Sequence, residues 1–407
     1  MLGLIWGVMG NPGEVVAGEK WLTVVIPVRP RIMWKDSSIE SLTKLIEVLE
    51  KQKVAATWLV ADDVWKDGEV IGELGRRRGL GDEIGLWLEV YGTTAERAGV
   101  EYLANTPWYK PGVVFLSGYG REERRALIEM MVRDYENVWG EAPKSAGAWW
   151  IDSWSMAKLA NMGVKTAMIV AEQEGTDGYT VGGQWVGLPY LASKKNILKP
   201  ATVTDNLGVT IIQWAMRDPI EAFGGEGAEF SNFSVQANDY QQKGLGIDYF
   251  EKVAGHYLND NDWGQLTIGL EAGMESVGNE GEMEKQIKKV KEMGAVATTM
   301  NQFGEWYENK YPSIGELKIG DEGQGWVMSK AGRRNEKLGK ENDYTKVGYE
   351  SDNWVADKNE RLERKLVAWN GNNLDRLEVE AKRRKKNVAS CWMGVVGVGI
   401  SIPVGDV

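Results

Sequence analysis

Between about residues 21 and 311, short apolar runs alternate with segments in which apolar residues recur every three or four positions. Continuous apolar runs are typical of strands buried in a parallel sheet, and the second pattern is typical of helices packed on one face. Their regular alternation predicts an α/β fold. The predicted strands are 22–28, 54–60, 83–90, 146–151, 166–170, 209–215, 265–270 and 295–299, and the clearest predicted helices are 38–52, 122–138, 155–162 and 282–293.

Seven or eight consecutive units of this kind can close into a barrel whose functional residues lie at the carboxyl ends of the strands. An open, doubly wound sheet is the competing architecture. No G-x-G-x-x-G sequence opens a helix after the first strand, so the chain offers no support for a dinucleotide site. We therefore predict a barrel.

Three regions are predicted along the chain. Residues 1–20 form an N-terminal extension whose apolar start is either the remnant of an export signal or a strand or disordered end. Residues 21–311 form the barrel, and residues 320–407 form a small C-terminal appended region. Within that region, the almost uncharged run 388–404 is short for a membrane span, which needs about 20 apolar residues. Packed strands are the default for this run, and membrane association of the C-terminus is the alternative.

Composition narrows the chemistry. The chain contains one histidine, His256, and one cysteine, Cys391, so a site with several histidines, a disulfide or a multi-cysteine zinc site is excluded. The net charge of −11 disfavours nucleic acid as a partner, since binding it needs a basic surface. The 19 tryptophans far outnumber the 6 phenylalanines, and an indole offers a flat apolar face for a sugar ring and an N–H donor.

Charged and aromatic residues follow the predicted strands, where a barrel would have its mouth. They either pair with one another around the rim or contact a polar ligand, because an unpaired buried charge is too costly. Together with the tryptophans they favour a carbohydrate cleft. The candidate catalytic residues are Glu89, Glu271 and Asp152, and the candidate substrate-binding residues are Arg29, Arg31, Asp62, Trp87, Trp149, Trp150, Trp214 and Arg217.

Glu89 and Glu271 are the preferred catalytic pair, because each closely follows a strong strand. Two carboxyl groups across a sugar act as acid and nucleophile, or as acid and base, depending on their separation. Arg29 and Arg31 would orient these carboxylates or bind an anionic sugar group.

Five segments resemble polysaccharide deacetylases in their order along the chain. They are VAATWLVADDVW (54–65), GDEIGLWLEV (81–90), residues 135–168, QLTIGLEAG (265–273) and residues 284–307. The resemblance covers about 20–310. It implies a distorted (β/α)7-type barrel, a poly- or oligosaccharide as partner and an extracytoplasmic location.

The chain departs from the family where the family's chemistry lies. The acidic pair that ends the family's first strand is replaced by the sequence around Arg29 and Arg31. The metal-binding histidines fall near Asp82 and within 87–91, and the catalytic histidine falls on Glu271, so none is histidine. We therefore expect no histidine–metal site, no other cofactor and no deacetylation by the family mechanism. A divalent metal held by carboxylates alone, such as Asp82, Glu89 or Asp152, stays open.

Three hypotheses about function follow. The first is a deacetylase-like barrel that binds a glycan without chemistry, and the second is a carboxylate-based glycan hydrolase. The third is a non-catalytic scaffold or interaction protein. A mouth in which every carboxylate is paired with a basic residue would favour the scaffold, whereas a groove lined by tryptophan would favour the first two hypotheses.

Overall fold

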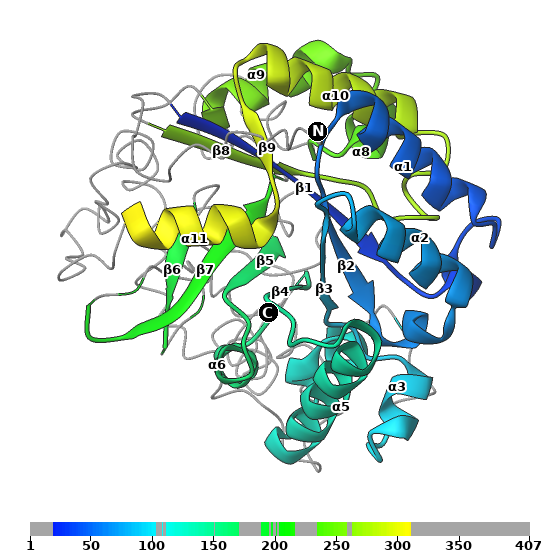
Figure 1. The fold of residues 1–407 in the computed structure, drawn as a ribbon, viewed down its shortest axis with the longest axis vertical. Helices are drawn as coiled ribbons and strands as arrows, with labels where there is room; N and C mark the ends of the chain where they lie inside the picture. Colours follow the sequence, from blue (N-terminus) through cyan, green and yellow to red (C-terminus); the bar gives the residue numbers. More distant parts are fainter. Residues whose placement is uncertain are drawn as a thin grey trace, which may run out of the picture.

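The chain folds into a closed parallel barrel surrounded by helices (Figure 1). The computed structural model describes residues 19–102, 108, 111–149, 151–170, 189–194, 197, 201, 203–215, 234–258 and 263–310. Seven parallel strands follow one another around the barrel in the order β1-β2-β3-β4-β5-β7-β8 and return to β1. The strands are β1 (Glu19–Val28), β2 (Thr57–Ala61), β3 (Glu83–Trp87), β4 (Ser145–Gly147), β5 (Thr166–Val170), β6 (Tyr190–Ser193), β7 (Asn206–Trp214), β8 (Trp263–Ile268) and β9 (Val296–Thr298).

The predicted distorted (β/α)7-type barrel is confirmed, and every predicted strand overlaps an observed one. The open sheet is excluded because β1 pairs in parallel with both β2 and β8. The distortion has two sources. Strands β7 and β8 share a single register pair, Trp214 with Thr267, and the short strand β9 pairs with the first half of β1. Strand β6, which the apolar pattern does not predict, adds antiparallel to β7.

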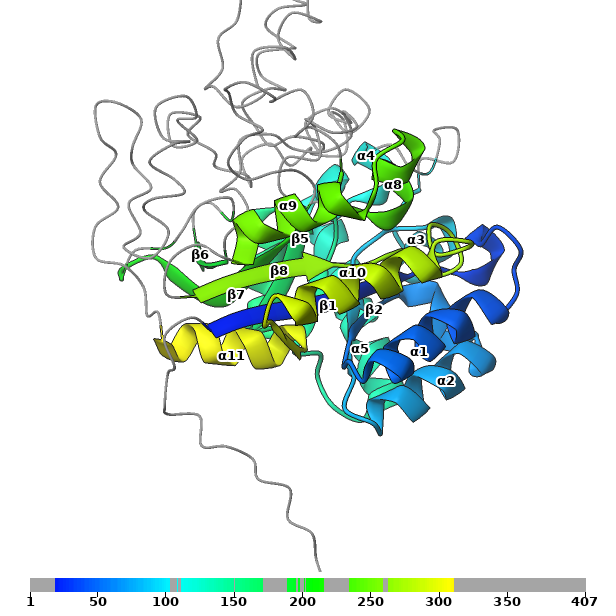
Figure 2. The ribbon, with the colours of Figure 1, turned by 90° about the horizontal axis from the view of Figure 1, so that it is seen from above.

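Helices cover the outside of the barrel because each presents one apolar face to it (Figure 1). Two views at right angles show α1, α2 and α10 beside β1 and β2, and α5 beside the shorter strands β3 and β4 (Figure 2). The helices are α1 (Glu40–Gln52), α2 (Gly68–Arg78), α3 (Gly92–Arg97), α4 (Pro111–Val114), α5 (Arg121–Trp139), α6 (Ser153–Asn161), α8 (Ala237–Gln242), α9 (Ile247–Leu258), α10 (Glu280–Glu292) and α11 (Met300–Lys310).

Helix α11 crosses the amino ends of the strands. The backbone N–H of Met300 donates to Thr57 at the start of β2, and Thr210 of β7 donates to the carbonyl of Gly304. A Cβ atom at Gly304 would lie 2.0 Å from the hydroxyl oxygen of Thr166, the first residue of β5. Only glycine allows this approach, and α11 thereby packs against the amino end of the barrel, opposite the predicted functional mouth.

Two further expectations concern residues that the structure for the most part does not describe. The predicted regions 1–20 and 320–407 lie almost entirely outside them, and so does the run 388–404. Within the described part of the chain, no helix combines the length and apolar character that a membrane crossing requires.

Candidate functional site

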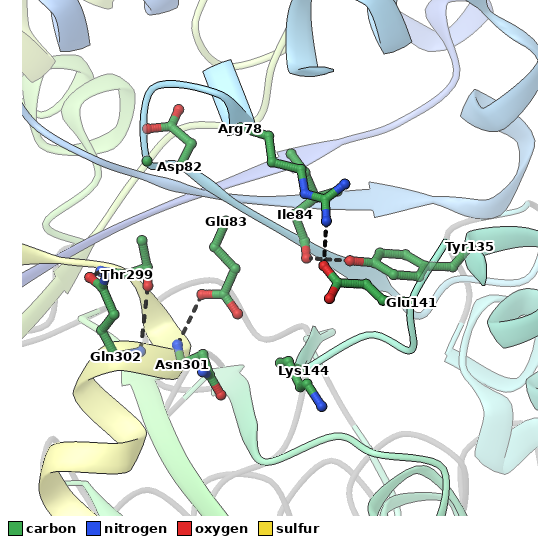
Figure 3. A pocket seen from close by; sticks show the side chains of 11 residues that line it. Arg78, Asp82, Glu83, Ile84, Tyr135, Glu141, Lys144, Thr299, Asn301 and Gln302 are labelled. Atoms are coloured by element: carbon green, nitrogen blue, oxygen red, sulfur yellow. Dashed lines mark hydrogen bonds and ion pairs between the residues drawn. The ribbon is translucent and has the colours of Figure 1, made fainter. Parts of the chain in front are cut away.

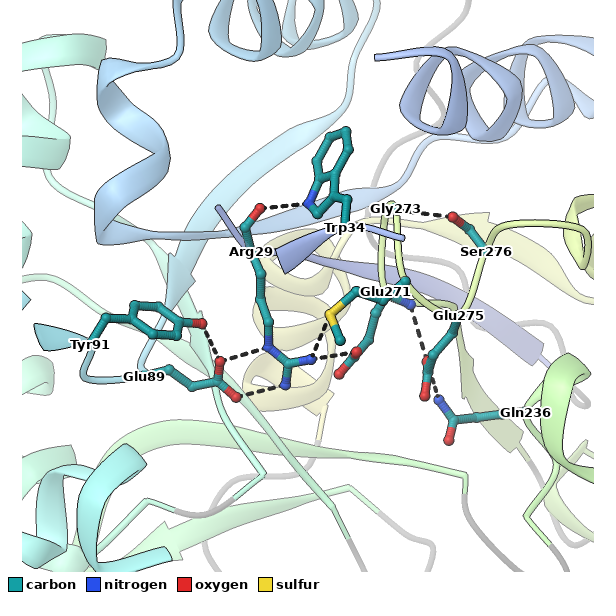
Figure 4. Close-up of polar contacts among 10 residues, drawn as sticks. Arg29, Trp34, Glu89, Tyr91, Gln236, Glu271, Gly273, Glu275 and Ser276 are labelled. Carbon is teal, nitrogen blue, oxygen red and sulfur yellow. Dashed lines mark hydrogen bonds and ion pairs between the residues drawn. The ribbon is translucent and has the colours of Figure 1, made fainter. Parts of the chain in front are cut away.

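Arg29 occupies the centre of the carboxyl end of the barrel. It directly follows β1, its side chain is buried, and the indole N–H of Trp34 donates to its carbonyl oxygen at 2.8 Å. Its guanidinium makes a two-pronged contact with Glu89, from Nε to Oε2 at 2.7 Å and from Nη2 to Oε1 at 2.7 Å. The remaining Nη1 donates to Glu271 and to the sulfur of Met274 (Figure 4). One arginine therefore binds both preferred catalytic carboxylates.

Glu89 reaches this position from β3. The strand ends at Trp87, and the chain continues past Glu89 to Tyr91, whose hydroxyl donates to Oε2 of Glu89. Glu89 is fully buried and therefore relies on these contacts in place of water. Burial raises the pKa of the Tyr91 phenol well above its ordinary value, and the Glu89 charge adds to this rise, so Tyr91 stays a hydrogen-bond donor at neutral pH.

Glu271 is positioned by a tight turn after β8. The N–H of Ala272 donates to the carbonyl of Pro27 at 2.9 Å, which ties this turn to the end of β1. Gly273 has a φ of +72°, and a Cβ atom there would lie 2.1 Å from the Trp34 ring. Both the left-handed backbone and the missing side chain are needed, so the sequence Glu271-Ala272-Gly273 builds the turn that aims the carboxylate at Arg29.

A second carboxyl group lies behind Glu271. Glu275 accepts from the Glu271 backbone N–H at 3.2 Å and from the Gln236 side chain at 2.8 Å (Figure 4). Burial raises the pKa of Glu275 well above its ordinary value, and the charges of Glu271 and Asp239 add to the rise. The two hydrogen bonds hold Glu275 beside Glu271 and not on Arg29.

The electrostatic balance of this cluster keeps Arg29 charged. Burial alone would lower the pKa of its guanidinium, but the charges of Glu271 and Glu89 outweigh that effect and raise the pKa well above its ordinary value. Burial raises the pKa of Glu271, while the charge of Arg29 opposes this rise. We call Arg29, Glu89 and Glu271 the mouth triad. The charged groups of the mouth triad bind one another, and Tyr91 donates a further hydrogen bond to Glu89.

Three tryptophans line the same end of the barrel. Trp87, Trp149 and Trp214 pack edge to face, with ring centroids 4.9 Å apart for the first pair and 5.4 Å for the second. The Arg29 guanidinium also lies over the rings of Trp87 and Trp108. All three edge-to-face rings are buried, but the indole nitrogens of Trp87 and Trp214 have no hydrogen-bond acceptor among the described residues. These two N–H groups are unused donors at the carboxyl ends of β3 and β7.

The other predicted carboxylates form separate ion pairs. Asp152 caps α6 by accepting from the Ser155 N–H at 2.9 Å, and it pairs with the fully buried Arg124. Asp62 pairs with Arg97 at 2.6 Å. Neither Asp62 nor Asp152 makes a hydrogen bond with a residue of the mouth triad in the described structure.

Arg31 also lies outside the mouth triad. It points to the rim and pairs with Asp67 and Glu69 at 2.5 and 2.6 Å, with its side chain partly exposed. The remaining predicted residues, Trp150 and Arg217, lie outside the described residues.

The carboxylates considered for a metal are not assembled into a site. Asp82 precedes β3, whereas Glu89 follows it, so the two lie at opposite ends of the barrel. Asp82 is held by Arg77 at 2.8 Å and by the Trp58 indole at 2.6 Å. Among the described residues no group of three or more acidic, histidine or cysteine side chains could hold a metal ion.

Several site residues are not predicted from the sequence. Tyr91, Met274 and Glu275 each lie within four residues of a predicted carboxylate, and this proximity is the signal that could have found them. Arg124 shares the buried face of α5 with Leu127, Ile128 and Met131, where a charged residue indicates a buried partner.

Comparisons with known proteins support the fold. A protein from Parabacteroides distasonis, described as a glycoside hydrolase/deacetylase, superposes with a TM-score of 0.53 and 17% identity over 74% of this chain and 73% of that one. The chain shares the (β/α)7-type barrel fold of that protein. Weaker structural matches include a polysaccharide deacetylase structure from Mycobacterium smegmatis (TM-score 0.43, 13% identity, 75% of this chain and 96% of that one) and Puue allantoinase (TM-score 0.44, 10% identity, 75% and 95%). No protein-family model and no curated protein sequence matches the chain. At these identities the likeness concerns the fold alone.

Proposed function

We propose that this deacetylase-like barrel binds a poly- or oligosaccharide at its carboxyl end without deacetylating or cleaving it. The observation that carries the proposal is the position of Arg29, which forms ion pairs with both Glu89 and Glu271. In the family that the sequence resembles, the corresponding strand end bears acidic residues. Here a permanently charged guanidinium fills the centre of the mouth, and this favours binding over chemistry.

A carboxylate-based hydrolase is disfavoured by the same contacts. A glycosidase needs one protonated and one ionised carboxyl group with a sugar or a water between them. Arg29 occupies the space between Glu89 and Glu271 and binds both carboxylates. The raised pKa of Glu271 is the feature that a general acid would need, yet its carboxyl group already accepts a hydrogen bond from Arg29.

The support for carbohydrate binding comes from the aromatic side of the mouth. The indole N–H groups of Trp87 and Trp214 have no acceptor among the residues that the structure describes, and buried donors are normally satisfied by protein, water or ligand oxygen. Sugar hydroxyls supply such oxygens. The description of the Parabacteroides distasonis protein as a glycoside hydrolase/deacetylase agrees with a carbohydrate partner.

The scaffold hypothesis has an observation of its own. The predicted carboxylates Glu89, Glu271, Asp62 and Asp152 all pair with arginine, which is the arrangement expected if the barrel only supports contacts elsewhere. The scaffold is therefore the second candidate function, and a glycan-binding experiment distinguishes it from carbohydrate binding.

The test is a glycan-array screen of the full chain, followed by mass spectrometry of each bound glycan after incubation. We expect binding with unchanged glycan mass. Trp87→Phe removes one indole N–H and should weaken binding by about tenfold, the effect of about 1.4 kcal/mol. Trp139→Phe is the matched control, because Trp139 also has a buried indole nitrogen that no described residue accepts from, but it lies at the end of α5.

Each alternative has its own outcome. Loss of acetyl mass would overturn the proposal in favour of deacetylation, and shortened glycans that disappear in a Glu89→Gln/Glu271→Gln variant would establish the hydrolase. Absence of binding to any glycan would leave the scaffold.

A further inference from the structure

The amino end of the barrel contains a cavity of about 240 Å³, on the far side of the molecule from the mouth triad. It lies between the start of β3, the end of α5, the loop before β4 and the start of α11 (Figure 3). Its walls are polar and include Glu83, Asn301, Lys144 and the Arg78–Glu141 pair. The volume is below the 300–1,000 Å³ of a typical site for a drug-sized ligand, so the cavity suits a small molecule.

Glu83 is the anionic wall of this cavity. One carboxylate oxygen, Oε2, accepts from the Asn301 N–H at 2.9 Å and from the Thr57 hydroxyl at 3.1 Å. The other oxygen, Oε1, is buried and has no hydrogen-bond partner among the described residues. Burial raises the pKa of Glu83, while the Asn301 N–H and the hydroxyls of Ser145, Thr57 and Thr299 oppose the rise. Oε1 makes no hydrogen bond of normal geometry with a described residue and can accept one from a ligand.

Asn301 provides a second unused acceptor. Its side-chain amide nitrogen donates to Glu305 at 2.8 Å, which fixes the amide orientation. Its Oδ1 is buried and has no partner in the described part of the chain. Two buried acceptors in one cavity call for a ligand with several donors, and an ammonium group supplies three.

Lys144 is the cationic wall. The other acidic and basic side chains at the cavity already form ion pairs, Arg78 with Glu141 and Asp82 with Arg77. No ion pair joins the Lys144 ammonium to another described residue, and its side chain is exposed at the cavity. A ligand that carries both an ammonium and a carboxylate would complement the Glu83 carboxylate and the Lys144 ammonium.

We infer that this cavity binds a small zwitterion of the amino-acid class, with its ammonium at Glu83 Oε1 and Asn301 Oδ1 and its carboxylate at Lys144. A polyol would satisfy the acceptors but would leave Lys144 without a counter-ion, so the charge pattern favours the zwitterion. The inference does not depend on glycan binding at the mouth, which lies at the other end of the strands.

The experiment is a calorimetric titration of the full chain with each of the common L-amino acids, and with ethylamine, propionate and glycerol as fragments. We expect at least one amino acid to bind with a Kd of about 1 mM or tighter, and each fragment to bind at least about tenfold more weakly. Lys144→Gln should weaken the amino acid by about tenfold, and Glu83→Gln should do so as well. Lys165→Gln is the matched control, because Lys165 is an exposed lysine close in sequence that does not line the cavity.

Three results would overturn the inference. They are the absence of binding by any amino acid, equal binding of glycerol, and equal weakening by Lys165→Gln and Lys144→Gln. If Glu83→Gln fails to fold, the exposed Lys144→Gln variant still decides the question. A glycan-array result leaves this test unchanged, so failure of one proposal is distinguishable from failure of the other.

Discussion

At the carboxyl end of the barrel, Glu89 and Glu271 share one buried arginine, whereas at the amino end Glu83 has one oxygen bound and the other without a partner in the part of the chain that the structure describes. The first arrangement satisfies charge within the fold, and the second leaves an acceptor in a cavity. Barrel enzymes of this kind normally place their reactive groups at the carboxyl end. Among the described residues, Glu83 places a buried carboxylate oxygen without a partner at the opposite end, in a cavity. A fold therefore indicates where a site is expected, while hydrogen bonding indicates which groups are available to a ligand.

The strongest way to test this contrast is to remove Arg29. Arg29→Met would leave Glu89 and Glu271 buried without a counter-ion, and breaking such a pair costs about 3–5 kcal/mol. Urea unfolding at neutral pH should show a loss of stability of this size. Burial raises the pKa of Glu271, so the loss should shrink as the pH falls and this carboxyl becomes protonated.

Arg31→Met is the control for Arg29→Met, because Arg31 pairs with Asp67 and Glu69 in a partly exposed position. Exposed pairs contribute about 0–1 kcal/mol. Equal losses for the two variants would show that the mouth triad is no more important for stability than a surface ion pair.

A second pair of variants tests burial at two helix N-caps. Asp152 and Asp67 each cap a helix and each pair with an arginine, but only the pair of Asp152 with Arg124 is fully buried. Asp152→Ala should cost about 3–5 kcal/mol because Arg124 loses its counter-ion, whereas Asp67→Ala should cost about 1 kcal/mol for the lost cap. Thermal or urea unfolding gives both values, and similar losses would contradict the assignment to burial.

The barrel and the preferred carboxylates follow from local sequence patterns. Glu89 and Glu271 are predicted because each comes shortly after an apolar run that forms a strand. The sequence also predicts that Arg29 and Arg31 orient these carboxylates, but it does not predict that Arg29 alone does so, since the contact requires β3 and β8 to lie around β1 in a closed barrel. The role of the predicted tryptophans is also set by closure, which packs Trp87, Trp149 and Trp214 against one another and buries them.

The amino-end cavity is harder to predict. Glu83 and Asn301 are 218 positions apart, and although each lies in a segment that resembles the family, neither is a candidate site residue in the sequence. They meet because α11 crosses the amino ends of the strands, and the sequence pattern does not predict this helix. Glycine at 304 interrupts its helical pattern, although the structure needs that glycine for the contact with Thr166.

Asp62 supplies a pH-dependent test of intermediate size, because it is buried yet only partly balanced by Arg97. Burial is the main cause that raises its pKa from 3.8 to about 6, while the Arg97 charge opposes the rise. The folded protein therefore binds this proton more tightly than the unfolded chain does. The resulting stability is fully present below about pH 4 and is lost as the pH rises through 6, by at most about 3 kcal/mol.

Asp62→Asn should remove this loss, so the variant should gain stability relative to the wild type, by at most about 3 kcal/mol, as the pH rises through 6. Asp63→Asn removes a neighbouring charge that adds to the rise and should reduce the pH dependence without abolishing it. Parallel stability curves for wild type and Asp62→Asn would show that Asp62 is as well balanced as the mouth triad.

The smallest expected effect concerns the amino end. Glu83 stabilises α11 through its contact with the Asn301 N–H, and a carboxylate at a helix N-terminus contributes about 0.3–1 kcal/mol. Glu83→Gln keeps an acceptor there and should change the free energy of unfolding by less than about 1 kcal/mol, and the exposed Lys144→Gln by less than about 0.5 kcal/mol. A loss at Glu83→Gln as large as that at Arg29→Met would mean that Glu83 is committed to the fold in the same way as Glu89 and Glu271. Its second oxygen would then not be expected to bind a ligand, and the contrast between the two ends of the barrel would disappear.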